Sequence, residues 1–324
     1  MPPLIIAHRG ASGYRPEHTL AGYELAALLG ADFLEPDLVS TNDGVLVARH
    51  EPEIGGTTDV AAHPEFADRH SSRVIDGVSL TGWFAEDFTL AELRTLRAVE
   101  RIPALRPDNT RFDGRFDIPT FAEILTLAAR MSQRLGRTIG VYPETKHPSY
   151  HTAIGLPLEP ALVAGLRDAG LDRADSPVFV QSFEVGNLRA LRESGLAVPL
   201  VQLAQSGMSP PDLTGTDLLT PAGLRSVAEY ATALGPDKDA VLAPDGTPTR
   251  LLGDAHAAGL AVHPYTFRTE NEFLPPPLRR GSRPDGRGDG VAELARFLRH
   301  GVDGVFTDHP DVAVFARAEH LATH

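Results

Sequence analysis

The sequence predicts a closed α/β barrel of eight parallel strands with helices outside, a TIM (β/α)8 barrel, formed by a single domain that spans residues 1–324. The chain has 324 residues, of which 42% are hydrophobic and 23% charged, and this is enough for one large core. Short apolar runs alternate with helical patterns about eight times, which favours parallel strands covered by helices. Polar side chains able to carry chemistry follow several of these runs, as expected where the strand ends of a barrel meet at one rim.

Eight short apolar runs are the expected barrel strands. In chain order they cover residues 4–7, 33–39, 139–142, 178–180, 198–203, 240–243, 260–262 and 303–306. The run at 240–243 has the weakest strand signal of the set. A further run at 45–48 follows the turn-forming residues 42–44, so we expect it to fold back antiparallel on the second strand.

Helical periodicity separates the apolar runs. The expected helices cover residues 19–29, 158–169, 185–193, 222–234, 248–258 and 291–300. Thr19 is the expected N-cap of the first helix. Residues 51–117 are too long for a plain loop, so we expect an inserted subdomain there, with one helical patch at 90–99. Residues 271–290 are rich in Pro, Arg and Gly and are expected to form a mobile loop at the rim.

Charge and composition restrict the classes of partner. The formal net charge is −13 and the pI is about 5.4, and an acidic chain is a poor ligand for nucleic acid or anionic membrane. The absence of cysteine excludes disulfides, zinc-thiolate sites and a thiol nucleophile. No run approaches the roughly 20 apolar residues of a membrane span, and the first residues lack a signal-peptide pattern. We therefore expect no stable membrane insertion and a cytoplasmic location, with export after signal removal as the alternative.

Two carboxylates mark the end of the second expected strand. Residues two apart on a strand share one face, so Glu35 and Asp37 repel each other unless a cation joins them. The following turn brings His50 back beside them: a turn at 42–43 places it opposite Glu35, and a turn at 43–44 places it opposite Asp37. Either register predicts a site for a hard divalent cation next to an acid/base histidine. The alternative is a half-solvated strand face.

Other strands also end in candidate site residues. His8 and Arg9 follow the first strand, and the guanidinium of Arg9 is a donor fork suited to phosphate. Glu144 and Lys146 follow the third strand, with a plain surface ion pair as the alternative. The remaining strand-end candidates are Gln181, Ser182, His263 and Asp308. Taken alone, an amide at such a place is equally a capping side chain, and a histidine is equally a hydrogen-bonded rim residue.

Eight motifs occur in the order that characterises one enzyme family. They are His8-Arg9-Gly10, Pro16-Glu17-His18-Thr19, Glu35-x-Asp37, His50, Glu144-x-Lys146, Gln181-Ser182-Phe183, His263-Pro264-Tyr265-Thr266 and Asp303-Gly304-x-Phe306-Thr307-Asp308. Together they resemble the glycerophosphodiester phosphodiesterases, specifically the branch typified by the bacterial periplasmic enzyme. The resemblance covers nearly the whole chain. Many relatives have Asn where this chain has His18, which leaves the role of His18 open.

The resemblance implies a phosphodiesterase-type barrel that hydrolyses glycerophosphodiesters, such as glycerophosphocholine and glycerophosphoethanolamine, to an alcohol and sn-glycerol 3-phosphate. It implies three groups of site residues. The acid/base pair is His8 and His50, the metal ligands are Glu35, Asp37 and Glu144, and the phosphate or substrate contacts are Arg9 and Lys146, to which we add Gln181 and His263. One divalent cation is expected, because oxygen-only ligands suit calcium first and magnesium second.

Two alternative functions differ in what they require of the chain. A related lysophospholipase D or sphingomyelinase D-like phosphodiesterase needs an apolar groove, and the mostly polar residues 51–117 do not favour one. A barrel that binds phosphorylated polyols without turnover would be indicated by loss of a histidine or a metal carboxylate, and none is lost. The sequence does not distinguish the acid histidine from the base, nor attack by the glycerol 2-hydroxyl from attack by water. It gives no oligomeric state.

Overall fold

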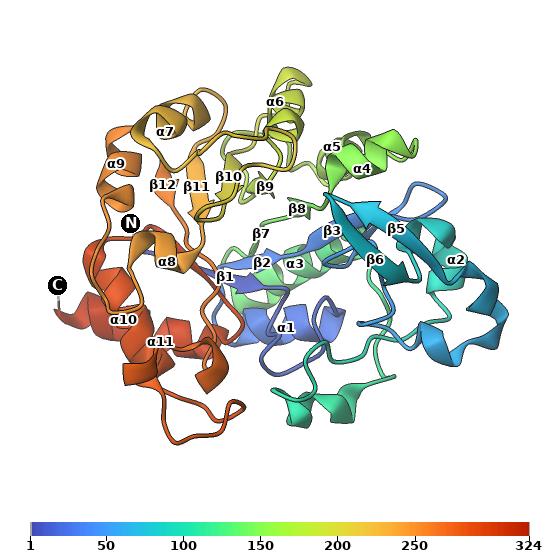
Figure 1. Cartoon of the computed structure of the whole chain (residues 1–324), viewed down its shortest axis with the longest axis horizontal. Coiled ribbons are helices and arrows are strands. Elements are labelled where there is room, and N and C mark those ends of the chain that lie inside the picture. The colour runs from blue at the N-terminus through green and yellow to red at the C-terminus, as the bar shows by residue number, and fades with distance from the viewer. Residues whose placement is uncertain (1, 324) are drawn as a thin grey trace.

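The computed structural model describes residues 2–323, and within them eight strands form a parallel barrel surrounded by helices (Figure 1). The barrel strands are β1 (Leu4–His8), β2 (Phe33–Glu35) with its continuation β3 (Asp37–Ser40), β7 (Gly140–Val141) with its continuation β8 (Glu144–Thr145), β9 (Val180–Ser182), β10 (Leu200–Ala204), β11 (Ala233–Pro236), β12 (Ala261–Val262) and β13 (Gly304–Thr307). The ring closes between β13 and the chain at β12, where Asp303 N donates to Val262 O at 3.0 Å and Phe306 N to Pro264 O at 3.1 Å. The TIM barrel expected from the sequence is therefore confirmed.

Proline interrupts two of the barrel strands. Pro36 separates β2 from β3, and Pro143 lies between β7 and β8. Because proline has no N–H, it cannot donate to the ladder. One half of each interrupted strand belongs to the sheet β13-β1-β2-β7. The other half belongs to the sheet β12-β11-β10-β9-β8-β3-β4, whose edge strand β4 covers Leu46–Ala48. Both interruptions lie immediately before a candidate metal ligand, Asp37 in one case and Glu144 in the other.

The strands direct alternate side chains to the barrel interior and to the helix layer. The interior cluster consists of Ile6, Phe33, Tyr142, Val201, Ala233 and Phe306. Their strand neighbours, such as Ile5 and Leu34, pack in the larger cluster beneath the helices. Two residues beyond the first three interior positions come His8, Glu35 and Glu144, so the period of two carries these side chains to the inside at the barrel mouth.

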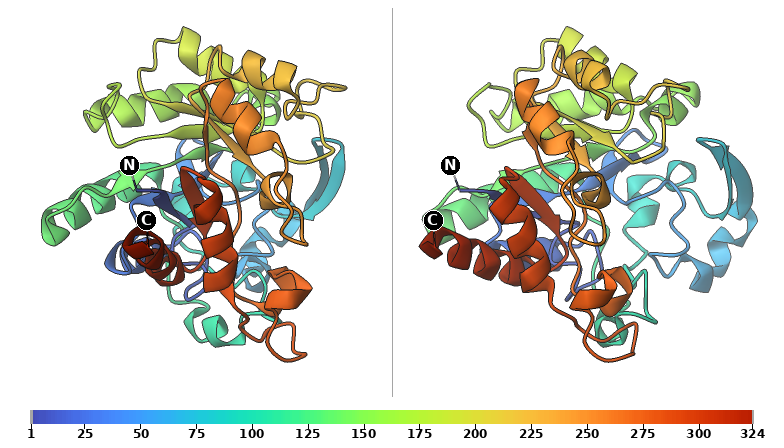
Figure 2. Two further views of the ribbon diagram at one scale, coloured as in Figure 1. Left: turned by 90° about the vertical axis from the view of Figure 1, so that its left-hand side faces the viewer. Right: turned by 60° about the vertical axis from the view of Figure 1, so that its left-hand side comes forward.

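The outer helices are α1 (Leu20–Leu28), α3 (Phe121–Leu135), α5 (Leu158–Asp168), α6 (Val185–Glu193), α7 (Pro221–Val227), α9 (Leu251–Ala257), α10 (Gly290–His300) and α11 (Pro310–Thr323). Thr19 is the N-cap of α1, as expected, and accepts a hydrogen bond from Gly22 N at 3.1 Å. Helices α10 and α11 pack against each other on the outside of the barrel (Figure 2). Sequence periodicity did not indicate α3 or α11.

The expected sixth strand at 240–243 is wrong. The sixth strand is β11, which pairs with Val201 to Ala204 of β10, while α8 (Lys238–Val241) occupies the first half of the expected range. The expected helix 222–234 is α7, which ends at Val227, because the chain from Ala233 onward forms β11. Ala and Leu favour helix by intrinsic propensity, but the backbone at 233–236 pairs with β10 on one side and β12 on the other, and this tertiary pairing overrides the local preference.

Both expected registers of the hairpin after β3 are also wrong. The return strand β4 (Leu46–Ala48) pairs Val39 with Val47, midway between the two expectations. The loop has three residues, 42–44, and Gly44 at φ +77° occupies the left-handed region that such loops require. His50 consequently lies opposite neither carboxylate along the ladder, although its side chain still reaches the same cavity.

Residues 51–117 form short elements beside the barrel. These are the 3-10 turns η1 (Val60–Ala62), η2 (Pro64–Arg69), η3 (Ala85–Asp87) and η4 (Pro107–Phe112), the hairpin of β5 (Ser71–Ile75) and β6 (Val78–Gly82), and α2 (Leu90–Leu93). The expected helical patch is thus confined to four residues. A separate apolar cluster, which includes Phe66 and Phe88, packs against Val39 and Val47 of the β3–β4 hairpin.

The segment that follows the seventh strand is held by internal hydrogen bonds. Residues 271–290 contain the 3-10 turns η5 (Asn271–Phe273) and η6 (Pro276–Leu278). The Asn271 amide donates to Arg280 O at 2.9 Å and to Arg283 O at 2.8 Å. Elsewhere, a short helix α4 (Pro148–Ala153) follows β8. Among residues 2–323, no helix is long and apolar enough to cross a membrane, and the cytoplasmic location stays a prediction.

Candidate active site

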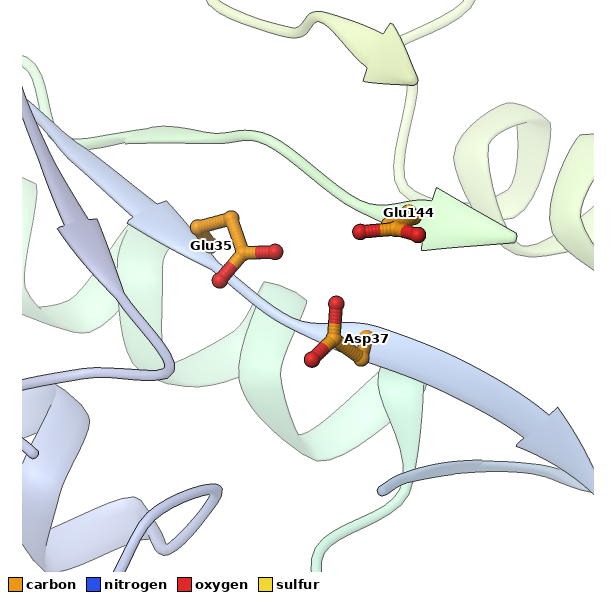
Figure 3. A group of neighbouring side chains, drawn as sticks. All are labelled: Glu35, Asp37 and Glu144. Carbon is orange, nitrogen blue, oxygen red and sulfur yellow. The ribbon is translucent and has the colours of Figure 1, made fainter. Parts of the chain in front are cut away.

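Three carboxylates converge where prolines interrupt two barrel strands: Glu35 ends β2, Asp37 begins β3 and Glu144 begins β8. Ligand atoms of Glu35, Asp37 and Glu144 lie within 4.8 Å of one another, and the side chains point toward a common centre (Figure 3). Asp37 and Glu144 are direct partners in the ladder between β3 and β8. The three residues are buried, with Glu35 and Asp37 only 1% exposed. Three buried acids at this distance are unfavourable unless protons or a cation reduce their repulsion.

The protonation of the acidic cluster shows that repulsion. Burial, together with the neighbouring Asp37 and Glu144, raises the pKa of Glu35 well above its ordinary value. Burial also raises the pKa of Glu144, to about 8. Burial acts in the same direction on Asp37, but the charges of Lys146 and Arg9 prevail and hold its pKa well below the usual range. A cation bound among the three acids would offset this repulsion and lower the pKa values of Glu35 and Glu144.

The donor set fits a hard divalent cation. The three carboxylates supply only oxygen atoms, which suit calcium or magnesium rather than zinc. Gln181 adds support, because its Nε2 donates to Glu35 Oε1 at 3.0 Å while its Oε1 is buried with no hydrogen-bond partner among the described residues. His18 fixes the orientation of Asp37 through Nε2, 2.9 Å from Asp37 Oδ2, and its Nδ1 lies 2.7 Å from the Tyr23 hydroxyl. The acidic cluster can therefore hold a metal ion.

His8 is oriented by Asp308, a residue from the far end of the chain. His8 Nδ1 lies 2.6 Å from Asp308 Oδ1, while Asp308 Oδ2 accepts from Arg106 Nη2 at 2.5 Å and from Arg268 Nε at 2.8 Å. Burial and the charge of Arg9 lower the pKa of His8 to about 4, although Asp308 acts in the opposite direction. His8 is therefore neutral at pH 7, with Nε2 left for substrate.

His50 is also oriented by a carboxylate that is paired with an arginine. Its Nδ1 bonds to Glu51, and Arg101 then bridges Glu51 and Glu17, with Nη1 2.7 Å from Glu51 Oε1 and Nη2 2.7 Å from Glu17 Oε1. Burial and the charges of Arg9 and Lys146 lower the pKa of His50. Both imidazoles are thus tied through a carboxylate to an arginine from residues 51–117.

The two basic residues expected to contact phosphate are paired with site carboxylates. Arg9 Nη1 donates to Glu17 Oε2 at 3.1 Å, and Arg9 Nε lies 3.2 Å from Asp37 Oδ2. Lys146 Nζ donates to Glu144 Oε1 at 2.8 Å. These pairs place positive charge beside the acidic cluster.

A cavity of about 950 Å³ joins these groups. Its wall includes His8, Arg9, Glu35, His50, Glu144, Lys146 and Gln181. Of the described residues after β12, Tyr265, Thr266 and Arg268 line the cavity but His263 does not. His263 lies inside the barrel, 2% exposed, with Nδ1 2.9 Å from the Tyr142 hydroxyl.

The sequence interpretation missed Arg106, Arg101 and Arg268. The first two lie in irregular structure, where no periodicity indicates which way a side chain points. Arg268 follows the quoted motif at 263–266 by two residues, which on an extended chain is the same face as Thr266 and was the available signal. A barrel whose mouth combines an acidic cation site with two imidazoles and basic side chains is suited to hydrolysis of phosphate diesters.

Comparison with known proteins agrees with this class. Residues 8–312 match the glycerophosphoryl diester phosphodiesterase family, and the chain belongs to that family. A glycerophosphodiester phosphodiesterase of Arabidopsis thaliana is 35% identical over 94% of this chain and 83% of its own length. One from Haemophilus influenzae is 28% identical over 96% of this chain and 88% of its own. The sequence resemblance to this family is thereby confirmed, and these names do not favour the lysophospholipase D alternative.

Solved structures share the fold. The putative glycerophosphoryl diester phosphodiesterase of Silicibacter pomeroyi has a TM-score of 0.70 at 23% identity, covering 98% of this chain and 95% of that chain. A phosphodiesterase of Oleispira antarctica, solved in complex with the product sn-glycerol-3-phosphate, has a TM-score of 0.65 at 20% identity, covering 97% and 96%. At these identities the likeness concerns the barrel alone.

Proposed function

We propose that this chain hydrolyses glycerophosphodiesters to an alcohol and sn-glycerol 3-phosphate, with one divalent cation held by Glu35, Asp37 and Glu144. The observation that carries the proposal is the clustering of these three acids, two of which, Glu35 and Glu144, line one cavity together with the imidazoles of His8 and His50. The names of the relatives support the substrate class, as does the product bound to the Oleispira protein. The expected substrate is a small molecule. Nucleic acid is not an expected partner, because the chain carries a net negative charge.

His8 and His50 would act as the acid/base pair. One imidazole removes the proton of the attacking hydroxyl, and the other donates a proton to the oxygen of the departing alcohol. Because both histidines have lowered pKa values in the free protein, both begin neutral, which suits the base. The acid must gain its proton together with the anionic substrate, whose charge favours an imidazolium. Asp308 and Glu51 keep each ring in place through Nδ1.

Arg9 and Lys146 would offset the charge of the diester. Their pairing with the site acids fixes them beside the acidic cluster, so positive charge is in place before the substrate arrives. A divalent cation supplies Lewis-acid polarisation of phosphoryl oxygens and a ligand position for hydroxyl groups. Calcium is the first choice and magnesium the second. Gln181, beside Glu35 on the cavity wall, stays a predicted substrate contact, whereas His263 lies inside the barrel and does not line the cavity.

The decisive test is release of sn-glycerol 3-phosphate from glycerophosphocholine by the purified full chain. We expect turnover with calcium or magnesium, loss of turnover with excess chelator, and recovery when the ion is restored. His8→Ala and His50→Ala should each lower kcat by about 10²- to 10⁴-fold, the usual contribution of a general acid or base.

His300→Ala provides the matched control, because His300 is an exposed histidine at the end of α10. Its kcat should equal that of the wild type. Full activity in excess chelator would contradict the role of the ion. Unchanged rates in both catalytic-histidine variants would contradict the acid/base assignment, and tight binding of glycerophosphocholine without product would favour a non-catalytic barrel.

A further inference from the structure

Arg268 is a cavity residue to which neither the sequence nor the family match assigns a role. Its neighbour Phe267 is buried, packs on Phe297 of α10 and continues the barrel ladder through Phe267 N, which donates to Phe306 O at 2.8 Å. The alternation of an extended chain turns the next side chain the other way. Arg268 therefore lines the active-site cavity, and a quarter of its side-chain surface, 25%, is exposed.

The guanidinium of Arg268 is fixed on one edge and free on the other. Nε donates to Asp308 Oδ2 at 2.8 Å, and the group lies 4.6 Å from the ring centre of Phe273. Within residues 2–323, Nη1 and Nη2 have no acceptor. The ion pair and the ring thus restrict the guanidinium, while its two terminal nitrogens, with four N–H donors between them, are available to a ligand.

The other cations of the site each form an ion pair with a buried carboxylate. Arg9 contacts Glu17 and Asp37, and Lys146 contacts Glu144. Arg106 shares Asp308 with Arg268, but all three of its nitrogens have acceptors: Glu270 for Nε, Ser12 O for Nη1 and Asp308 for Nη2. Among the described arginines that line the cavity, Arg268 is the one with both terminal nitrogens free of an acceptor, whereas Arg9 has Nη1 bonded to Glu17 and only Nη2 free.

We propose that Arg268 is a principal binding residue for the phosphoryl group, donating from Nη1 and Nη2 to two phosphoryl oxygens. This inference rests on the proposed function for the identity of the substrate, but its chemistry requires only a tetrahedral oxyanion. Planar guanidinium groups bind two oxygens of a phosphate in parallel, which a single ammonium group does not. Because Asp308 contacts both Arg268 and His8, the bound phosphoryl group would lie beside the imidazole that acts on it.

The test compares Arg268→Gln with Arg280→Gln. Both changes remove one guanidinium charge, but Arg280 is exposed, bonds to Asp289 and lies outside the cavity wall. Calorimetry would measure the Kd of inorganic phosphate and of sn-glycerol 3-phosphate at a fixed calcium concentration, with glycerol as the uncharged comparison. We expect Arg268→Gln to raise the Kd of both anions by about 10- to 100-fold, because hydrogen bonds to a charged group are lost. The Kd of glycerol should not change in Arg268→Gln. In Arg280→Gln, the Kd values of both anions should equal those of the wild type.

Two further variants distinguish direct binding of phosphate by Arg268 from an indirect effect of its ion pair with Asp308. Arg106→Lys perturbs the other guanidinium on the same carboxylate, so it should alter kcat with the Kd of phosphate unchanged. Arg268→Lys retains the charge without the planar fork, and its Kd should fall between those of wild type and Arg268→Gln. Thermal unfolding of each protein would verify that it is folded.

Phosphate affinity in Arg268→Gln within twofold of wild type would overturn the proposal. So would an equal loss of phosphate affinity in Arg106→Lys, because the effect would then arise from Asp308. Failure of this assignment can be told apart from failure of the proposed function, because phosphate binding and substrate cleavage are measured separately. A wild-type protein that binds phosphate through Arg268 but does not cleave glycerophosphocholine would refute the activity alone, and turnover with unaltered phosphate binding in Arg268→Gln would refute this assignment alone.

Discussion

Asp308 joins one imidazole and two guanidinium groups at the mouth of the barrel. It is 2% exposed, so its negative charge is stabilised by His8, Arg106 and Arg268 rather than by water. Burial alone would raise the pKa of Asp308, but the charges of Arg268 and Arg106 prevail and hold it well below its usual range. The carboxylate therefore stays ionised under all conditions in which the enzyme is expected to work.

We expect Asp308→Asn to lower kcat by at least about 100-fold, because His8 loses its oriented partner. The same change leaves two guanidinium groups without their carboxylate, which should cost about 3 kcal/mol or more of unfolding free energy. Asp175→Asn is the control, since Asp175 forms an exposed pair with Arg173. Steady-state kinetics and denaturant unfolding measure both effects. A wild-type kcat in Asp308→Asn would contradict the orienting role.

Asp308 also predicts a pH dependence of stability. Because its pKa in the folded protein lies below that in the unfolded chain, ionisation of Asp308 stabilises the folded state above the unfolded value of about 3.9, and this contribution is lost as the pH falls further. The difference in unfolding free energy between wild type and Asp308→Asn should be constant from pH 5 to 7 and shrink below about pH 4. Denaturant unfolding at several pH values measures it, and a difference that grows toward low pH would show the opposite sign.

Lys146 differs from Arg268 in what it is expected to contribute. Its ammonium already bonds to Glu144, so a substrate gains little from it on binding, whereas charge that develops in the transition state lies close by. Lys146→Ala should lower kcat more than it raises KM. Measuring both constants for Lys146→Ala and Arg268→Gln side by side would show the contrast. A raised KM with unchanged kcat in Lys146→Ala would show that Lys146 only anchors substrate.

The elements differ in how well local sequence specifies them. Thr19 identified the start of α1, and α6 spans the residues expected from periodicity, because an N-cap and an amphipathic pattern are local signals. Strand β11 was missed because Ala233 and Leu234 favour helix while Gly235 and Pro236 favour neither helix nor strand, and only pairing with β10 and β12 makes the segment a strand. The hairpin register depended on whether the turn has two residues or three, which the sequence 42–44 allows in either form.

Helix α3 shows a local signal that was present but unused. Thr120 and Glu123 form a capping box: Glu123 N donates to Thr120 Oγ1 at 3.2 Å, and Thr120 N donates to Glu123 Oε2 at 2.8 Å. Thr120→Ala should lower the unfolding free energy by about 1 kcal/mol without changing KM. Thr126→Ala, on the exposed face of the same helix, should not destabilise the protein. Equal losses in the two variants would refute the capping role.

Residues 51–117 contribute to the site in a way that the sequence could not reveal. Arg101 and Arg106 extend from this segment to the carboxylates that hold His50 and His8. By contrast, the period-two pattern of the strands was sufficient to place His8, Glu35 and Glu144 on one rim, and the structure brings them to one cavity. His263 shows the limit of that pattern. Its position at a strand end predicted a side chain in the cavity, but the side chain lies inside the barrel against Tyr142.

At the scale of the whole molecule, the acidic cluster predicts that stability depends on a cation. An ion that binds only the folded chain stabilises it by RT ln(1 + [ion]/Kd), about 2.7 kcal/mol at 100-fold Kd. Calcium added to chelator-treated protein should therefore raise Tm, and a calcium and magnesium series would rank the two ions. Sodium at equal ionic strength should have no comparable effect. Glu144→Gln should abolish most of the response, and an undiminished response would place the ion elsewhere.

The barrel closes by joining its first strand to its last. Strand β1 pairs with β13, and His8 meets a partner 300 positions further along the chain. While the ribosome is still making this protein, one edge of β1 stays open and the first imidazole lacks its carboxylate. The nascent polypeptide consequently has no complete active centre until Asp308 has been synthesised, and we expect a chain truncated before Asp308 to lack phosphodiesterase activity.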